Sequence, residues 1–273
     1  MWQCPLCQHA LDTRSSSWRC VNNHSFDQAK SGYVNLLPVQ NKRSKQPGDD
    51  KPMLIARRNF HQARGYEPLM QNLHKLIKSH LNGYKTAYTI YEAGCGEGAY
   101  LAFVTQALCQ DGYDIKAFGS DIAKAGVEMA AKKYKNAQFV VGSNFDLPVA
   151  AHTLDVVMQI FAPGNHIEYA RVLTKQGMLV TVDPGPNHLC ELKALVYTKP
   201  ELHNAPQLLP DPWRLDEEQR VHFNVDLSAD TLKQGLLNMT PYTWKLTKEK
   251  YEDIMQHLDT VTADFIIRVW RPQ

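Results

Sequence analysis

Hydrophobic and polar residues show two alternating patterns through the middle of the chain. Short apolar stretches bounded by polar or glycine-containing turns predict strands at about 88–93, 115–120, 137–142, 154–160 and 177–183. Between them apolar residues recur every three or four positions, which predicts helices at about 98–110, 123–134, 165–173 and 187–197. Strands that alternate with amphipathic helices indicate an α/β fold built on a mostly parallel, doubly wound sheet.

The segments on either side of this unit carry weaker patterns. Residues 41–52, NKRSKQPGDDKP, are polar and lack periodicity, so we expect a loop and a boundary near residue 50. Helical spacing follows, with a Gly-Tyr-Glu-Pro break at 65–68. Toward the other end, FIIRVW at 265–270 predicts a closing antiparallel strand. The tryptophans of this part are interpreted as core or edge packing residues: Trp213, Trp244 and Trp270.

The composition narrows the class of protein. The chain has 273 residues, of which 44% are hydrophobic, so a real core is expected. It holds no apolar run long enough to span a bilayer, and its first residues, MWQCPLCQHA, do not resemble a secretion signal. We therefore expect a soluble, cytoplasmic protein with no membrane partner. In that compartment the six cysteines are not expected to form a disulfide framework.

Charge is distributed unevenly along the chain. The net charge is +2, but residues 1–85 carry 13 Lys/Arg against 5 Asp/Glu, and the remainder carries 17 against 23. A basic front half suggests contact with a polyanion, although an unevenly charged solvated surface is the alternative. The candidate phosphate-contacting residues are Lys42, Arg43, Lys45, Arg57, Arg58 and Arg64.

The first thirty residues contain two pairs of metal-ligand type. Cys4 and Cys7 form a CxxC motif, and CVNNH supplies Cys20 and His24 after a further dozen residues. Two such pairs on tight turns match a tetrahedral Zn²⁺ site, and three thiolates with one imidazole would close it, so the ion would be structural. The alternatives are a redox-active CxxC beside an unrelated pair, or His9 as the fourth ligand. The other cysteines are interpreted as small packing residues: Cys95, Cys109 and Cys190.

A glycine-rich turn, YEAGCGEG at 91–98, joins the first predicted strand to the following helix. Its ExGxGxG spacing, with Glu92 before Gly94, Gly96 and Gly98, differs from the GxGxxG of dinucleotide folds and lacks the GK[ST] of a P-loop. The next strand ends at Asp121, where a carboxylate can accept both hydroxyls of a ribose. Ser143 and Asn144 follow the third strand, where they would face an adenine edge. This ordered set fits S-adenosylmethionine.

These motifs resemble those of class I S-adenosylmethionine-dependent methyltransferases with a Rossmann-like sheet. CPLC…C…H, FDQAKSGYVNLLPVQ, PGD and ARRNF…GYEPL resemble more closely the large-subunit (23S) ribosomal RNA guanine-N1 methyltransferases. The resemblance implies a zinc-binding RNA-recognition domain at 1–35, a basic connector with helices at 36–85 and a catalytic domain at 86–273. It also implies methyl transfer to N1 of a guanine in a hairpin loop of 23S ribosomal RNA. Glu92 and the TKQG turn differ from the commoner Asp and KPGG but keep the charge and the turn.

Guanine N1 carries a proton that must leave, so a base or a group that stabilises charge on O6 is expected beside it. Asp183 and His188 are equal candidates for the base, and Glu191 lies near them. Phe161 could stack on a flipped base, with a core aromatic as the alternative. The methionine end of the cofactor has its own candidates, Tyr66 and Glu97, and His188 is a candidate for cofactor contact as well.

Two other functions fit parts of the sequence. A small-molecule methyltransferase would share the glycine turn but has no need of a zinc module or a basic front half. An inactive, zinc-dependent RNA-binding protein would have no need of the intact Glu92, glycines and Asp121. The pattern leaves the oligomeric state open, with a homodimer among the states considered.

Overall fold

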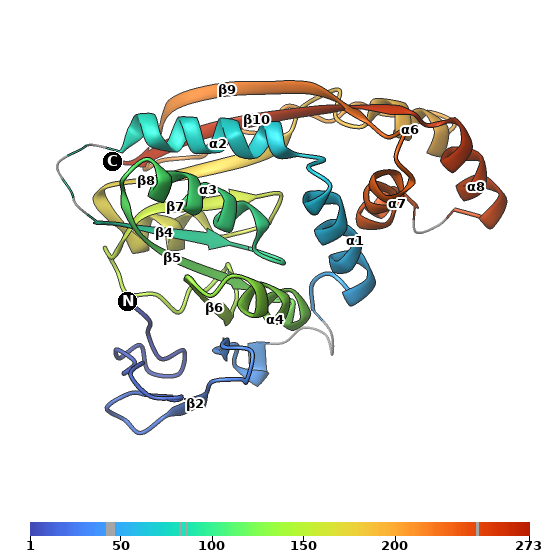
Figure 1. Cartoon of the computed structure of the whole chain (residues 1–273). Coiled ribbons are helices and arrows are strands. Elements are labelled where there is room, and N and C mark those ends of the chain that lie inside the picture. Colours follow the sequence, from blue (N-terminus) through green and yellow to red (C-terminus); the bar gives the residue numbers. More distant parts are fainter. Residues whose placement is uncertain (42–46, 82, 84, 86, 244–245) are drawn as a thin grey trace.

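The computed structural model describes residues 1–41, 47–81, 83, 85, 87–243 and 246–273. An eight-stranded sheet forms its centre, in the order β3-β6-β5-β4-β7-β8-β10-β9 (Figure 1). Its strands are β3 (Val34–Asn35), β4 (Ala87–Ala93), β5 (Asp114–Asp121), β6 (Ala137–Val141), β7 (Leu154–Ile160), β8 (Leu173–Pro184), β9 (Trp213–Asp226) and β10 (Thr260–Pro272). The predicted α/β fold is confirmed.

Six strands of this sheet, from β3 to β8 in the sheet order, run parallel, so their carboxyl ends lie along one edge. All five strands that the hydrophobic pattern predicts are among them. β10 pairs antiparallel with β8, which confirms the closing strand expected at 265–270. β9 pairs antiparallel with β10, and its bounds were not predicted, because many of its residues are polar and exposed at the edge of the sheet.

Helices form at the four stretches that the apolar spacing predicts between the strands, and others form before and after them. They are α1 (Lys51–Gln62), α2 (Glu67–His80), α3 (Ala99–Gln110), α4 (Lys124–Lys133), α5 (His166–Val172), α6 (Cys190–Val196), α7 (Asp230–Met239) and α8 (Lys248–His257). α1 begins at the expected boundary, because the Asp50 side chain accepts a hydrogen bond from the Met53 N–H at 2.8 Å. The expected break at 65–68 separates α1 from α2.

The two faces of the sheet support two separate cores. Alternate residues of a strand point to opposite faces, so Ile90 enters the first core while Tyr91 enters the second. Helices α1, α2, α3, α4, α6 and α7 contribute to the first core. The second core is completed by α5 and by the N-terminal segment, including Trp2 and Trp18. The N-terminal segment therefore occupies part of a face that helices cover in an ordinary doubly wound sheet.

The N-terminal segment joins the main body at several points. It contains the short hairpin β1 (Ser17–Arg19) and β2 (Ser25–Asp27), and the chain then continues into β3 at the edge of the sheet. The Trp2 ring lies 5.7 Å from Phe118 and 5.9 Å from Trp18, and its Nε1 donates to Gln138 Oε1 at 2.9 Å. Figure 1 shows this segment beside the β6 edge of the sheet.

The interpretation of the tryptophans and cysteines is confirmed in part. Trp213 and Trp270 are buried, as expected, whereas Trp244 lies outside the described residues. Cys95 is buried, but the packing role expected for Cys109 is wrong, because Cys109 lies on the exposed face of α3. No helix among the described residues is long and apolar enough to cross a membrane.

Replacing Trp2 with alanine should weaken the attachment of the N-terminal segment. The change removes a buried indole and its hydrogen bond to Gln138, so we expect a loss of about 3–5 kcal/mol in the free energy of unfolding. Urea denaturation followed by circular dichroism would measure it. Val21→Ala in the same segment is the control, because Val21 is 75% exposed and should change stability by less than about 0.5 kcal/mol. A Trp2→Ala loss as small as that of the control would contradict this role.

Candidate active site and metal centre

A cavity of about 790 Å³ opens at the carboxyl ends of the parallel strands, within the size range of small-molecule sites. It extends from the end of β6 to the end of β8, which in the sheet order spans four inter-strand spacings, or about 19 Å. Many of the predicted site residues line it: Arg57, Tyr66, Glu92, Gly94, Gly96, Glu97, Asp121, Asn144, Phe161, Asp183 and His188. Gly98 and Ser143 are not among the lining residues.

The glycine turn forms the middle of the cavity wall. Gly94, Gly96 and Gly98 all adopt positive φ, a region that other residues rarely occupy. A Cβ on Gly94 would lie 2.5 Å from the Ala162 Cβ, and one on Gly98 would lie 3.0 Å from the Ala130 Cβ. Gly98 thus lets α3 begin against α4, while Gly94 lets the loop after β7 approach the turn. These close approaches give the wall its shape.

Two carboxylates hold this turn in place. Glu92 Oε2 accepts the Leu101 N–H at 3.0 Å, which satisfies a backbone donor in the first turn of α3. Asp121 accepts the Gly96 N–H at 2.8 Å through one oxygen and the Ala123 N–H at 2.7 Å through the other. Burial raises the pKa of Asp121. Burial also raises the pKa of Glu92 well above its ordinary value, and the negative charge of the nearby Glu97 raises it further. The site therefore favours a cationic ligand.

Residues of α1 cover the turn from the other side. The His61 Nδ1 lies 2.7 Å from Glu97 Oε1, and both side chains are buried. Arg57 lines the cavity and forms an ion pair with Asp49, in which the Arg57 Nη2 lies 2.7 Å from the Asp49 Oδ2. A Cβ on Gly96 would lie 3.5 Å from the Arg57 Nη1. Arg57 therefore contacts the expected cofactor end of the cavity.

The basic residues predicted to contact RNA do not share one environment. Arg64 has an exposed side chain whose Nε lies 3.3 Å from Glu67 Oε2, and Arg58 is half-buried. Arg57 faces the cavity, as described above. The remaining members of the predicted set, Lys42, Arg43 and Lys45, lie outside the described residues. Of the three described members of the predicted set, Arg64 is the most exposed and therefore the most available to an external phosphate.

Of the two polar residues that follow β6, Ser143 lies within the turn and Asn144 faces the cavity. The Ser143 Oγ accepts the Phe145 N–H at 3.1 Å and stabilises the turn. Asn144 lines the cavity and donates from Nδ2 to the Pro163 carbonyl at 3.1 Å. The Asn144 Oδ1 is buried and has no hydrogen-bond partner among the described residues. An unpaired acceptor in a cavity wall indicates a ligand with a donor, such as an amino group.

Aromatic residues line the cavity farther from the glycine turn. Phe161 is 44% exposed and has φ of 52°, which is strained for a residue other than glycine. Its ring lies 5.3 Å from that of Phe265, which in turn lies 5.0 Å from the ring of Tyr66. Tyr66 is buried, so it both packs in the core and faces the cavity. Phe161 leaves an aromatic face available to a ligand.

Asp183 and His188 both line the cavity but differ in their electrostatic environment. Burial raises the pKa of Asp183, and no donor among the described residues bonds its carboxylate. His188 has a pKa of about 3, lowered by burial and then by the nearby His203 and Lys193. The Asp264 N–H donates to His188 Nδ1 at 3.4 Å, so the neutral ring carries its proton on Nε2. Asp183 is thus the better acceptor of a proton, and His188 is a donor.

Several lining residues were missed by the sequence analysis. His61 was read only as part of a helix, and its contact with Glu97 joins positions 36 apart in the chain. His203 and Tyr242 come from segments without a clear pattern, and neither carries a motif. Glu191, by contrast, does not line the cavity, because its carboxylate accepts hydrogen bonds from Thr262. The ARRNF motif could have indicated an inward-facing arginine, but the other residues carry no such signal.

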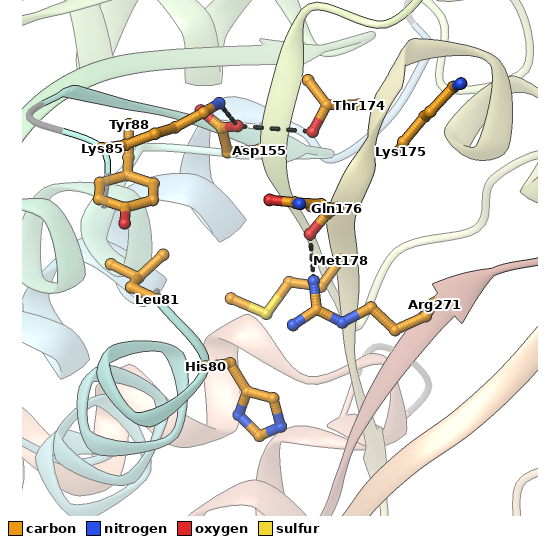
Figure 2. A pocket seen from close by; sticks show the side chains of 10 residues that line it. All are labelled: His80, Leu81, Lys85, Tyr88, Asp155, Thr174, Lys175, Gln176, Met178 and Arg271. Carbon is orange, nitrogen blue, oxygen red and sulfur yellow. Dashed lines mark hydrogen bonds and ion pairs between the residues drawn. The ribbon is translucent and has the colours of Figure 1, made fainter. Parts of the chain in front are cut away.

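A second, smaller cavity of about 250 Å³ lies at the opposite edge of the sheet (Figure 2). It is lined by residues at the beginnings of the parallel strands and by Arg271 near the end of β10. Two of its cations already have anionic partners: Lys85 pairs with Asp155 at 2.5 Å and Arg271 with Asp216 at 3.1 Å. This cavity is remote from the glycine turn and holds no pair of groups suited to catalysis.

The N-terminal segment brings Cys4, Cys7, Cys20 and His24 together, with all ligand atoms within 4.8 Å of one another. The His24 Nδ1 lies 3.4 Å from Cys4 Sγ and 3.5 Å from Cys20 Sγ, and Cys7 Sγ lies 3.6 Å from Cys20 Sγ. Tetrahedral Zn²⁺ bonds of about 2.3 Å to sulfur and 2.0 Å to nitrogen place neighbouring ligands about 3.5–3.8 Å apart. The four residues therefore fit a closed, structural zinc site. His9 is exposed and contacts the Cys7 carbonyl instead.

Replacing Cys4 with serine should release the metal. Because Cys4 is fully buried and supplies one of four ligands, we expect zinc content to fall from about one ion per chain to well below that. Elemental analysis of purified protein after dialysis against a chelator would measure it. Cys109→Ser is the control, because Cys109 is exposed and lies outside the cluster. Full retention of zinc by Cys4→Ser would exclude Cys4 as a ligand.

Comparisons with known proteins agree with this geometry. The family model described as "RlmA, N-terminal", a zinc ribbon, matches residues 2–45, and a methyltransferase domain model matches residues 90–189. The solved structure of YcgJ from Bacillus subtilis aligns with 74% of this chain and 98% of its own, with 16% identity and a TM-score of 0.45. That score is too low to carry an argument.

Relatives of similar length make the family clear. A Streptomyces fradiae protein named 23S rRNA (guanine(748)-N(1))-methyltransferase is 30% identical over 89% of this chain and 85% of its own length. YxjB of Bacillus subtilis strain 168, whose name assigns it provisionally to the same class, is 31% identical over 98% of this chain and 96% of its own. The chain belongs to the family of 23S rRNA (guanine-N(1)-)-methyltransferases.

Proposed function

We propose that this protein transfers a methyl group from S-adenosylmethionine to N1 of a guanine in a hairpin loop of 23S ribosomal RNA. The observation that carries the proposal is a single cavity whose wall has the glycine turn and buried carboxylates at its middle and Asp183 at the β8 end. Such a cavity can hold a donor and an acceptor side by side. The family relationship supports ribosomal RNA as the acceptor.

The residues at the glycine turn fit S-adenosylmethionine. When bound, it supplies a methyl group on a positively charged sulfur, whose carbon–sulfur bond breaks as the bond to N1 forms. Glu92, Glu97 and Asp121 would stabilise its positive charge, and Asp121 has capacity to accept from ribose hydroxyls. The unpaired Asn144 Oδ1 can accept from the amino group of an adenine. The Arg57 guanidinium can bind the methionine carboxylate.

Asp183 is proposed as the base that removes the N1 proton. Its pKa is raised toward the pH at which the enzyme works, which makes a carboxylate a better proton acceptor. His188 cannot take this role with Nδ1, because that atom already accepts a backbone N–H. Its Nε2–H can instead donate to an oxygen of the base that gains negative charge as the proton leaves.

An RNA loop fits the surroundings of the cavity better than a small molecule. N1 lies on the edge used for base pairing, so the guanine must be unpaired or flipped, as bases in hairpin loops are. Phe145 and Phe161, both at the cavity, are 58% and 44% exposed and offer rings on which bases can stack. The zinc segment and the basic residues near it can contact the loop's phosphates. A ribosomal RNA substrate also places the protein in the cytoplasm.

The proposed function is tested by mapping N1-methylguanine in 23S ribosomal RNA. RNA from a deletion strain should lack the modification at one guanine, and adding the wild-type gene back should restore it. Asp121→Ala should not restore it, because the variant loses a contact to the ribose and to Gly96, and calorimetry should show at least a 10-fold weaker affinity for S-adenosylmethionine. Identical methylation in the deletion and complemented strains would refute the function.

Replacing Asp183 with asparagine should separate catalysis from binding. We expect kcat to fall about 10²- to 10⁴-fold, while cofactor affinity stays within about twofold, because asparagine keeps the shape but cannot accept the proton. In the wild type, the rate should fall as pH falls through the raised pKa of Asp183, at a higher pH than for an ordinary aspartate. The pH dependence of single-turnover methylation would show both effects. An unchanged pH profile in Asp183→Asn would exclude Asp183 as the base.

A further inference from the structure

The cavity continues past Asp183 and His188 into a region that no proposed step uses. Its wall there is formed by His203 from the loop between α6 and β9, and by Tyr242 from the short 3₁₀ helix η2 (Pro241–Thr243). With the cofactor at the glycine turn, this end of the cavity remains for the acceptor base.

The loop that carries His203 is held in a defined position although it has no regular secondary structure. The His203 N–H donates to the Pro186 carbonyl at 3.2 Å, and Lys193 Nζ donates to the Glu201 carbonyl at 3.3 Å. The buried Arg268 donates from Nη1 to two further carbonyls of the loop, those of Pro206 at 2.9 Å and Gln207 at 3.0 Å. A long loop fixed by three basic or backbone donors indicates a functional element rather than a linker.

His203 and Tyr242 form a hydrogen-bonded pair, with His203 Nε2 3.3 Å from Tyr242 Oη. If the tyrosine hydroxyl donates, the neutral imidazole has an Nδ1–H left to donate; if Nε2 donates, the hydroxyl proton is left instead. Either arrangement leaves one donor. Burial and the nearby Lys193 lower the pKa of His203, which keeps the ring neutral. The His188 ring lies 6.0 Å away and carries its own Nε2–H donor.

We propose that His188, His203 and Tyr242 form a hydrogen-bond donor wall that recognises the O6 and N7 atoms of the target guanine. Guanine presents two acceptors on this edge, whereas adenine presents one acceptor and an amino donor, so a wall of donors selects guanine over adenine. Lys193, whose Nζ lies 5.8 Å from the centre of the Tyr242 ring, adds positive potential to the same wall. The inference rests on the proposed function and adds the residues that choose the base.

The test uses the full-length enzyme and a synthetic hairpin that contains the guanine identified by mapping. The hairpin is made with guanosine, 7-deazaguanosine or inosine at that position. 7-Deazaguanosine lacks the N7 acceptor, whereas inosine keeps O6 and N7 and lacks the 2-amino group. For wild type, we expect kcat/KM to be about 10- to 100-fold lower on 7-deazaguanosine than on guanosine.

The variants Tyr242→Phe and His203→Ala should lose activity on guanosine and no longer distinguish it from 7-deazaguanosine, because the donors that read N7 are gone. Their response to inosine should equal that of wild type. Tyr251→Phe is the matched control, because its hydroxyl contacts Asn238 on the surface and should change nothing. Cofactor affinity, measured by calorimetry, should stay within about twofold in all variants and shows that each is folded.

The outcomes separate the two proposals. If the 7-deazaguanosine penalty is the same in wild type and in both variants, the donor wall does not read this edge and the inference is wrong, while the proposed function stands. If wild type shows no penalty at all, the inference is also wrong. If wild type leaves N1 of the guanosine hairpin unmethylated, the proposed function fails and this inference with it.

Discussion

The site depends on two carboxylate–backbone contacts that fix the turn after β4. Glu92 holds the first turn of α3 through Leu101, and Asp121 holds Gly96 from the neighbouring strand β5. Because β4 and β5 are parallel and adjacent, the sheet brings both carboxylates to the same edge without further support. Burial raises the pKa of both carboxylates, so their charged forms are stabilised when a cationic cofactor binds beside them. The remainder of the cavity is arranged around this fixed turn.

The zinc segment has a structural role in the sheet in addition to the RNA contact proposed for it. Trp2 and Trp18 complete the core on the face that contains Tyr91, and β3 extends the sheet beside β6. A segment with so few apolar residues cannot fold alone, so the metal and the sheet stabilise it together. Contacts across this interface fix the position of the zinc segment relative to the cavity, so RNA bound there, as proposed, would be held at a constant position. A flexible tether would leave that position variable.

Much of the fold and of the cofactor end was predictable, because strong periodicity marks the parallel strands and Glu92, Asp121 and Asn144 follow successive strands in order. The bounds of β9 were not predicted, since the continuous polar run at 216–220 interrupts the alternation of apolar and polar residues along this edge strand. Arg57 was grouped with RNA-binding residues because a sequence shows charge but not the direction of a side chain. His203 and Tyr242 lie 39 positions apart in segments without periodicity, so their contact arises from tertiary packing that the sequence pattern does not reveal.

The acceptor end shows how one cavity can contain a base and donors without conflict. A neutral histidine ring can accept a hydrogen bond at one nitrogen and donate from the other. In His188 the backbone N–H of Asp264 occupies Nδ1, so the ring is left as a donor through Nε2. Asp264 is itself fully buried and held by Arg220 through two contacts, at 2.7 and 2.8 Å, so this backbone position is fixed. The proposed base is therefore Asp183, on the strand whose end also forms the cavity wall. A guanine bound beside them would lose its N1 proton to the carboxylate while its O6 receives donors, so the two requirements of the reaction would be met by different side chains at neighbouring positions of the base.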